Sequence, residues 1–315
     1  MEQFGVLSLG SRLKRLSDHL YNEVQSVYLS ESLVISSTYF PILRLLQQCG
    51  ELSVVEMAER LGLSHPAVSK QVSKMIKETL LIKRSDPHDQ RRSVLALSEL
   101  CAQQMALVEP VLEVIGDELE NYLNQVEGSF LEQLGQLEKS LLNAPYSDRV
   151  VLRLHPERLR FEPVSEATAP SFKALNLAWL TKFFPDDIYP QDMTTLNDPI
   201  GKIQQYGGQA ICALYKDKVL GTYIMTPSDV GELELSKLCV DPAYTGLGIG
   251  ERLMAHGLDY AEKQGVQQVM LESHTCLTPA LGLYRKLGFS VCKQDKPYSV
   301  PRANIRLVKT LEADS

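Results

Sequence analysis

The spacing of apolar residues follows a helical period through most of the first half of the chain. In segment 5–30, apolar residues recur at three- and four-residue steps, which predicts one long helix. A second helix is predicted over 38–48. Residues 99–142 form an acidic helical stretch with a break at Gly128 and Ser129. The first half is therefore predicted to be mainly α-helical.

A helix-turn-helix is predicted after the second helix. Ser53 and Glu56 form a capping box that begins a helix over 54–61. Gly62 ends that helix, and Ser64 begins the next one. A small residue, a turn glycine and a β-branched residue stand where two helices must cross closely. They are Ala58, Gly62 and Val68.

One side of the second helix is polar and basic, which fits a reader of the DNA major groove. The candidate DNA contacts on it are His65, Ser69, Lys70, Ser73 and Lys74. Two short strands, 81–84 and 93–97, flank the charged turn 86–92. This pattern predicts a β-hairpin wing beside the helix-turn-helix.

Positive charge is concentrated in this part of an acidic chain. The whole chain carries a formal charge of −7, but residues 60–92 hold eight Lys and Arg against three Asp and Glu, a local charge of +5. Since phosphate neutralisation drives DNA affinity, this contrast favours a nucleic-acid contact. The alternative is a solvated charged face on a winged helix that serves only dimerisation.

The helix-turn-helix and its wing resemble the winged helix of the MarR family, whose wing reads D-x-R-D-x-R before a strand and a Leu-Thr pair. This chain has Asp86, Asp89 and Arg91 in place, His88 where the family has Arg, and Leu97-Ser98 for the pair. The resemblance implies a double-stranded DNA operator as partner, with Arg91 and its neighbour Arg92 at the wing. It also implies a homodimer built by the first and last helices, here Val6–Val27 and Met105–Leu123. A coiled coil is the alternative for these helices.

The second half alternates strands with helices. Proline, asparagine and serine in 144–149 predict a linker between domains 1–143 and 150–315. A helix is predicted over 171–182. Residues 183–199 are expected to form an aromatic-rich loop, either lining an acceptor pocket or packing in the core. Strands are expected at 150–154, 209–215, 218–225, 233–240, 266–271, 291–292 and 305–308.

A strand, a glycine-rich turn and a helix follow one another in Glu234–Leu253. Asp241-Pro242 ends the strand, and an amphipathic helix occupies 251–263. Between them glycine stands at every second position, at Gly246, Gly248 and Gly250. Backbone N–H groups at such a turn, together with the helix dipole, form an anion site that a phosphate can approach closely.

The spacing G-x-G-x-G differs from the Rossmann fingerprint, and the Gly-Lys-Ser/Thr of a P-loop is absent. The stretch resembles motif A of the GNAT N-acetyltransferases, Gln/Arg-x-x-Gly-x-Gly/Ala after a strand ending Val-Asp-Pro. Thr245 stands where that family has Gln or Arg. The later segment 279–289, PALGLYRKLGF, resembles the family's A-x-x-LY-x-x-x-GF, a helix running into a strand. The two motifs together suggest a GNAT domain over roughly Val150–Leu311, with a mixed central sheet.

The GNAT resemblance implies acetyl-CoA as co-substrate and an amine, either a small molecule or a peptide, as acceptor. The backbone of Leu238, Cys239 and Val240 would bind the pantetheine arm. The pyrophosphate would lie against the loop formed by Thr245, Gly246, Leu247, Gly248, Ile249 and Gly250. A glycine-rich loop that serves only tight packing is the alternative.

Three side chains are candidates for proton transfer. Tyr284 occupies the family's LY position and is the candidate general acid; the alternative is a buried tyrosine packing on the sheet. Glu234 is the first candidate general base and Glu232 the second, because both share the parity of Ser236 on the strand. Either could instead be a solvated edge residue. Leu277 occupies a place where the family often has asparagine.

Composition narrows the remaining possibilities. The six cysteines are scattered and the histidines are not clustered, so no metal site or disulfide framework is predicted. No signal peptide or apolar run long enough to span a bilayer is present, so we expect a cytoplasmic protein. We predict a two-domain chain: a mainly α winged helix-turn-helix followed by an α/β GNAT domain. It would be a DNA-binding regulator and N-acetyltransferase, or alternatively a ligand-sensing transcription factor with little catalytic activity.

Overall fold

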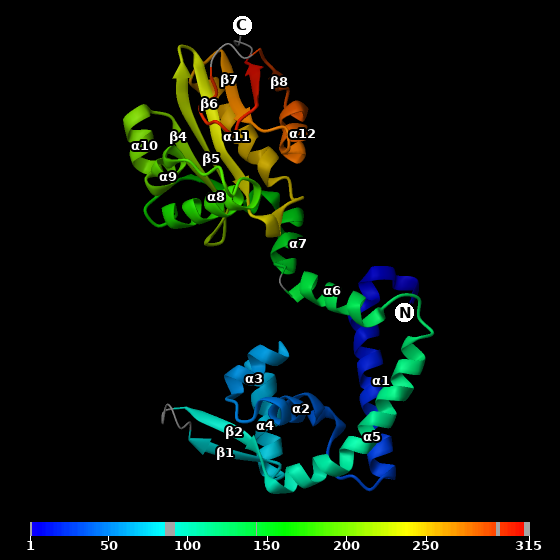
Figure 1. Cartoon of the computed structure of the whole chain (residues 1–315). Helices are drawn as coiled ribbons and strands as arrows, with labels where there is room; N and C mark the ends of the chain where they lie inside the picture. Colours follow the sequence, from blue (N-terminus) through cyan, green and yellow to red (C-terminus); the bar gives the residue numbers. More distant parts are fainter. Residues whose placement is uncertain (1, 86–91, 143, 294–296, 312–315) are drawn as a thin grey trace. The chain divides into compact units, whose positions relative to one another are not determined.

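The computed structural model describes residues 2–85, 92–142, 144–293 and 297–311 of the 315-residue chain. The chain divides into two compact units, Met1–Gln133 and Leu134–Ser315 (Figure 1). The predicted boundary at 144–149 lies beyond this division, and the linker stays a prediction.

The first unit is mainly helical, as the apolar spacing predicted. Its elements are η1 (Glu2–Ser8), α1 (Leu9–Ser30), η2 (Ser37–Tyr39), α2 (Phe40–Cys49), α3 (Val54–Leu61), α4 (His65–Lys77), β1 (Leu81–Ser85), β2 (Ser93–Leu97) and α5 (Glu99–Leu123), with α6 (Phe130–Leu142) crossing the division. The strands β1 and β2 form an antiparallel hairpin. The predicted helix over 5–30 is α-helical only from Leu9, because residues 2–8 form η1, which is kinked at Gly5 by a positive φ of 54°.

The helix-turn-helix forms as the sequence predicts. Ser53 accepts the Glu56 N–H, while the Glu56 carboxylate accepts the Ser53 N–H, so both halves of the capping box are present. Gly62 ends α3 in the left-handed region. Ser64 precedes α4, but its side chain forms no cap hydrogen bond there. Met57, Ala58 and Val68 are buried where α3 and α4 pack together.

The second unit is an α/β fold around a mixed seven-stranded sheet. Its elements are α7 (Tyr146–Leu154), η3 (Pro156–Arg158), β3 (Arg160–Pro163), α8 (Ala169–Phe183), α9 (Pro190–Asn197), α10 (Pro199–Tyr206), β4 (Gln209–Tyr215), β5 (Lys218–Asp229), β6 (Glu232–Val240), η4 (Pro242–Tyr244), α11 (Ile249–Lys263), β7 (Gln268–Ser273), α12 (Thr278–Lys286), β8 (Ser290–Val291) and β9 (Ile305–Thr310). The strand order is β3-β4-β5-β6-β7-β9-β8, and β6 with β7 is the parallel pair.

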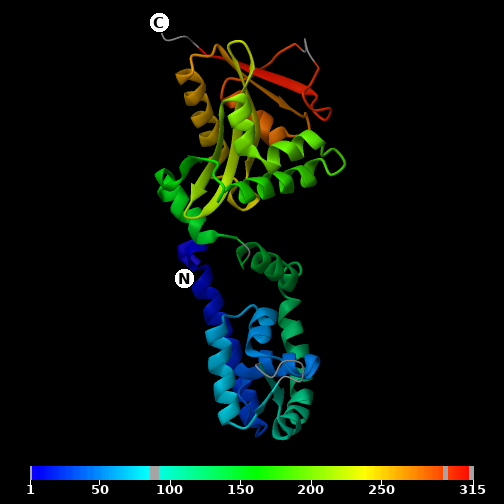
Figure 2. The same cartoon turned by 90° about the vertical axis from the view of Figure 1, so that its left-hand side faces the viewer.

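Helices cover both faces of this sheet. One apolar core joins α7, α11 and α12 to the sheet through residues such as Leu152, Leu253 and Leu281. A separate core joins α8, α9 and α10 to the opposite face through Phe172 and Leu196, and Figures 1 and 2 show these three helices gathered on that face. A sheet with helices on both faces buries near-continuous apolar strands, and β4 is buried over six of its seven residues.

Two predictions for this unit are wrong. Residues 150–154 form the end of helix α7 rather than a strand, because Leu152 alone is buried there while Val150 and Leu154 lie outward, as on a helix. The edge position of the sheet is filled instead by β3. Residues 183–199 are not only loop, since Pro190 opens α9 and Asp192 accepts the Tyr189 N–H at its start.

Candidate functional site

A cavity of about 970 Å³ lies in the second unit, beside the carboxyl end of β6. It is bounded by α8, β6, the loop after β6, the end of β7, α12 and the segment 299–303. Two of the three predicted proton-transfer residues, Glu234 and Tyr284, line it, and so do all residues of the predicted anion loop except Leu247. Residues up to 128 positions apart, from Leu175 to Ala303, therefore line one site.

The strands β6 and β7 separate at this cavity. They pair only from Glu232 to Glu234 on β6 with Gln268 to Met270 on β7. Beyond Glu234, β6 keeps its pairing with β5 but has no strand partner on its other edge within the described residues. Leu238, Cys239 and Val240 line the cavity along this edge. An extended ligand could therefore bond to β6 as an additional strand.

A β-bulge turns β6 at the point where it leaves β7. Thr222 on β5 pairs with Cys239 while Ile224 pairs with Ser236, so β6 holds one extra residue between them. Lys237 lies in the bulge with a φ of 54°. The Thr222 hydroxyl donates to the Lys237 carbonyl (2.9 Å) and accepts from the Asn176 amide (2.9 Å). These buried polar groups hold the bulge in place.

The glycine loop presents a row of backbone donors to the cavity. Gly248 has a φ of 72° and is the N-cap of α11, and Gly246 has a φ of 76°. Glycine is favoured at both positions because other residues rarely adopt this conformation. Among the described residues, no hydrogen bond uses the N–H groups of Gly246, Leu247, Gly248, Ile249 or Gly250. Unpaired N–H groups at a helix N-terminus form an anion-binding site.

Helix α7 holds this loop from outside the cavity. The Arg149 guanidinium donates to the carbonyls of Ala243 (2.7 Å) and Thr245 (3.0 Å). Asp148 accepts from Lys216 and from the Tyr244 hydroxyl, and the Lys216 ammonium lowers the pKa of Asp148. The Thr245 hydroxyl bonds to the Pro242 carbonyl, so it serves the turn itself. Arg149 places the positive charge here that Thr245 lacks.

Glu234 faces the cavity without a bonded partner. None of the hydrogen bonds or ion pairs among the described residues involves its carboxylate, although it lines the cavity. Burial and the nearby negative charge of Glu272 raise the pKa of Glu234, while the charges of Lys202, Lys237 and Arg306 oppose this shift. A half-buried carboxylate with a raised pKa is well suited to accept a proton near neutral pH.

Glu232, the second candidate base, lies outside the residues that line the cavity. Its carboxylate accepts hydrogen bonds from the Ser228 hydroxyl and the Gln268 amide. It stands at the start of β6, where β6 and β7 are still paired, so the shared strand parity does not bring it to the opening. The structure brings Glu234, and not Glu232, to the site.

Tyr284 comes from α12, is buried, and lines the cavity opposite the loop. Burial raises the pKa of Tyr284 to about 12, so its hydroxyl stays protonated at neutral pH and can donate a proton. Its ring lies 6.2 Å from that of Phe289, which directly precedes β8. Leu277, at the N-cap of α12, also lines the cavity and offers no polar side chain there.

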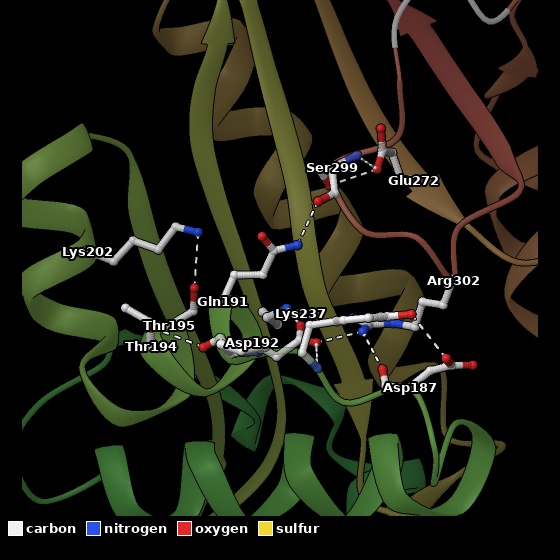
Figure 3. A network of polar contacts seen from close by, with 12 residues as sticks. Asp187, Gln191, Asp192, Thr194, Thr195, Lys202, Lys237, Glu272, Ser299 and Arg302 are labelled. Carbon is white, nitrogen blue, oxygen red and sulfur yellow. Dashed lines mark hydrogen bonds and ion pairs between the residues drawn. The ribbon is translucent and has the colours of Figure 1, made fainter.

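A polar network that the sequence did not predict closes the other end of the cavity (Figure 3). The Asp192 carboxylate on α9 is fully buried and accepts from Lys237 (2.7 Å) and, through both oxygens, from Arg302 (2.6 and 2.8 Å). Burial disfavours the Asp192 carboxylate, but the two cations outweigh it and lower its pKa. Lys237 and Arg302 line the cavity, whereas Asp192 lies behind them.

The segment before β9 lines the cavity and is held by side chains from two elements, β7 and α9. Glu272 on β7 accepts from the N–H and hydroxyl of Ser299 and from Arg306, and Gln191 donates to the Ser299 carbonyl (Figure 3). Arg302 is fixed by Asp192 and by the Asp187 carbonyl. Residues 299–303 are therefore hydrogen-bonded to β7 and α9 beside the cavity.

An aromatic wall lies beside this network. Trp179 and Phe183 come from α8, and Phe184 follows it. The rings of Trp179 and Phe184 lie 5.7 Å apart, and the Arg302 guanidinium lies over Phe184 at 5.9 Å. The prediction that residues 183–199 contribute to a pocket thus has support in Phe183 and Phe184, while Asp192 lies behind the wall.

Signals for the missed residues were weak in the sequence. Lys237 lies on β6, which the sequence predicted as a strand. Its place at the cavity depends on a β-bulge, and the alternation of residues along a strand cannot predict a bulge. Arg302 and Asp192 are 110 positions apart, and nothing in their spacing indicates a pair. Arg149 fell in a segment predicted as the edge of a linker.

In the first unit, α4 exposes the polar face that the sequence predicted. His65, Lys70, Ser73 and Lys74 are exposed and Ser69 is partly exposed, while Val68, Val72 and Met75 are buried on the opposite side. Lys74 also lies 3.8 Å from Glu78, and 64% of its side chain remains exposed. The face is free to meet a partner surface.

The wing can be followed only in part. Arg92 is described and forms an ion pair with Glu56 at 3.6 Å. Arg91 and its neighbours Asp86, His88 and Asp89 lie outside the described residues. The role of Arg91 at the wing therefore stays a prediction.

Two features that would indicate other functions do not occur in the described part of the chain. No group of three or more His, Cys, Asp or Glu side chains is arranged there to hold a metal ion. Within the same residues, no helix has both the length and the apolar content needed to cross a membrane.

A family model matches one segment in each half of the chain. Residues 35–92 match the model of the MarR family, and residues 173–289 match that of the acetyltransferase (GNAT) family. The first match covers α2 to the wing, and the second covers α8 to the start of the strand after α12.

Curated relatives resemble short segments of the chain. Mycothiol acetyltransferase of Renibacterium salmoninarum is 39% identical over 64 residues, which are 20% of this chain and 19% of that protein. The ribosomal protein bS18-alanine N-acetyltransferase of Escherichia coli is 34% identical over 71 residues, 22% of this chain and 48% of that protein. The matches thus span half or less of these relatives.

Among solved structures, a GNAT-family acetyltransferase from Staphylococcus aureus aligns with 49% of this chain and 99% of its own length. The identity is 20% and the TM-score is 0.46.

Proposed function

Because the chain joins a MarR-family domain to a GNAT-family acetyltransferase domain, we propose that it is a DNA-binding regulator that also transfers an acetyl group from acetyl-CoA to an amine. The observation that carries the enzymatic half is the opening between β6 and β7, with the unpaired N–H groups of the glycine loop at its end. The free edge of β6 leads to the anion site at the glycine loop. This arrangement suits a long ligand with an extended arm and a phosphate group.

The acetyl-CoA pantetheine arm would bond to the backbone of Leu238 to Val240 along the free edge of β6. The pyrophosphate would lie against the N–H groups from Gly246 to Gly250, where the dipole of α11 adds positive potential. Arg149 supports this site by fixing the carbonyl side of the same loop. These contacts would direct the thioester toward Tyr284 and Glu234, which line the same cavity.

Glu234 would remove the proton from the acceptor amine, because only a neutral amine can attack the thioester carbonyl. Tyr284 would donate its proton to the departing thiolate, since burial keeps the hydroxyl protonated. An ammonium loses two protons on becoming an amide. Glu234 would accept the first before the attack, and the second, lost as the amide forms, would restore the Tyr284 hydroxyl after its proton has passed to the thiolate. Glu232 has no place in this scheme, since its carboxylate bonds to Ser228 and Gln268 outside the cavity.

Mixing purified full-length chain, acetyl-CoA and an amine panel tests the enzymatic half. Release of free thiol with matching N-acetylated product would support it. Binding of acetyl-CoA without transfer to any amine would favour the second candidate, a ligand-sensing transcription factor. Leu277, which offers no polar group at the cavity, is the observation that keeps this second candidate open.

For the regulatory half, we propose that α4 enters the major groove with His65, Ser69, Lys70, Ser73 and Lys74. Arg91 and Arg92 of the wing would also contact the DNA, Arg91 in the minor groove. The exposed face of α4 supports this arrangement. Affinity for DNA should fall steeply with salt, because lysine and arginine contacts to phosphate release counterions. Lys70→Ala should reduce the slope of log affinity against log salt by about 1. An unchanged slope would exclude Lys70 from the phosphate contacts.

A further inference from the structure

Asp192, Lys237 and Arg302 form a buried group of charges at one end of the cavity, and these charges do not balance. Asp192 is the single carboxylate bonded to both Lys237 and Arg302, and its side chain has no exposed surface. The two cations are 16% and 10% exposed, and both line the cavity in front of it (Figure 3). One positive charge in this group is therefore left over and faces the cavity. Buried charges are normally paired, so a surplus of this kind needs a partner.

Both cations retain donors that no described residue uses. The Lys237 ammonium has three N–H groups and bonds to one acceptor, Asp192. The Arg302 guanidinium gives two bonds to Asp192 and one to the Asp187 carbonyl, out of five N–H groups. A second carboxylate, brought by a ligand, could take the remaining donors without displacing Asp192.

Of the acidic side chains that line the cavity, all but one are already paired. Glu272 is bonded to Arg306 and Ser299, and Glu251 to Lys286. Lys202 donates to the Thr195 hydroxyl. Glu234 alone among the cavity's acidic side chains has no bonded partner in the described residues.

An unpaired carboxylate and a surplus cation thus lie three residues apart on β6, on either side of the start of the bulge. We infer that the acceptor amine carries a carboxylate close to its amino group, as in a free α-amino acid. The ammonium would meet Glu234, and the carboxylate would meet Lys237 and Arg302. This inference rests on the proposed acetyl transfer and names its acceptor class.

The aromatic wall supplies a place for the side chain of such an acceptor. Trp179, Phe183 and Phe184 line the cavity beside Arg302. Ring faces favour an apolar or flat side chain over a charged one. We therefore expect apolar and aromatic amino acids to be better acceptors than acidic ones.

The experiment compares acceptors that differ only in the carboxylate. For phenylalanine, leucine and methionine, the free acid, the amide and the decarboxylated amine are each assayed with acetyl-CoA and the full chain. Two charge-assisted hydrogen bonds should make kcat/KM for the acid roughly 10- to 100-fold higher than for the amide or amine. Thermal stabilisation by each compound, measured with coenzyme A present, gives a second reading that does not depend on turnover.

Variants assign the preference to the proposed contacts. Lys237→Met removes the charge, keeps the length of the side chain and leaves the ion pair between Arg302 and Asp192 in place. The kcat/KM for the acid should then be within about threefold of that for the amine. Lys237→Arg retains the charge and should keep the preference. Lys263→Met, which removes an exposed lysine paired with Asp259 on α11, is the matched control and should change nothing.

Failure of the proposed acceptor class and failure of the proposed acetyl transfer give different results. Equal or faster acetylation of the amides or amines would overturn the acceptor class while leaving the transferase intact; a preference for amides would point to peptide N-termini. Stabilisation by acetyl-CoA with no acetylation of any compound would overturn the proposed transferase itself. If the Lys237 variants do not fold, the comparison of acids with amines on the unmodified chain still tests the proposed acceptor class.

Discussion

At the scale of single residues, Glu234 carries the account of proton transfer. Replacing it with glutamine removes the base but keeps the shape and burial of the side chain. We expect Glu234→Gln to lower kcat roughly 10²- to 10⁴-fold with acetyl-CoA affinity unchanged. Glu232→Gln is the matched control on the same strand, and its kcat should stay within about twofold. A larger loss in the control would return Glu232 to the mechanism.

The pH profile gives an independent test of the same residue. Glu234 works as a base only when deprotonated, so kcat/KM should fall as the pH drops through its pKa. Because burial and Glu272 raise that pKa, the acidic limb should lie at higher pH than for an ordinary glutamate. The limb should disappear in Glu234→Gln. A limb that persists there would assign the ionisation to another group.

Arg149 is the residue that links α7 to the anion loop. Its guanidinium bonds to two loop carbonyls, at Ala243 and Thr245, from 94 and 96 positions away. Arg149→Met should weaken acetyl-CoA binding about tenfold, because both carbonyls lose their donor and local positive charge is removed. Calorimetry measures this directly. Arg153→Met, on the same helix, serves as the control, and an equal loss there would assign the effect to α7 as a whole.

At the scale of elements, the cavity depends on β6 leaving β7 at the bulge. The Thr222 hydroxyl bonds to the Lys237 carbonyl inside the core, so Thr222→Val keeps the volume but leaves that carbonyl without its donor. We expect a loss of about 1–3 kcal/mol in the free energy of unfolding and a higher KM for acetyl-CoA. Thr222→Ser retains the hydroxyl and should keep the low KM. Equal KM values in both variants would show that the hydroxyl does not position the strand.

The sequence predicted most elements because their local signals agree with the fold. The capping box at Ser53, the left-handed cap at Gly62 and the glycine turn after β6 each fix a backbone conformation within a few residues. The prediction failed at α7, where apolar residues in a short segment fit a strand as well as a helix. It also missed α9 and α10, two eight-residue helices that fill one face of the sheet.

The candidate site was predictable where chemistry follows backbone pattern. A motif or strand parity marks Glu234, Tyr284 and the loop 246–250; all of these except Leu247 line one cavity, and their roles stay predictions. Asp192, Arg302 and Glu272 were missed because they meet only through tertiary packing between α9, β7 and the segment before β9. Strand parity also suggested Glu232, which lies outside the residues that line the cavity, because parity does not show where two strands part.

At the scale of the whole molecule, α1 exposes an apolar row that one chain leaves uncovered. Leu9, Leu13, Leu16 and Leu20 are each at least 38% exposed. We propose that the homodimer predicted through Val6–Val27 and Met105–Leu123 covers this row, since exposed apolar patches mark interfaces. The change Leu13→Glu with Leu16→Glu should yield monomers by light scattering and weaken binding to a palindromic operator.

Acetyl transfer should be unaffected by this double change on α1, because the cavity is built from residues of the second unit. The monomeric variant should retain its kcat. A variant that remains dimeric would place the interface elsewhere, and Lys14→Glu on the exposed polar side of α1 controls for added negative charge.

The central claim is that the glycine loop binds the phosphate of acetyl-CoA, and calorimetry on three chains tests it most directly. Gly248→Ala and Gly248→Glu introduce the same backbone strain at a φ of 72°, with open space around the new Cβ, but only the second adds a negative charge. Binding should persist, though weakened, in Gly248→Ala and be lost in folded Gly248→Glu. Equal affinity in the two variants, or no binding by the unmodified chain, would contradict the claim.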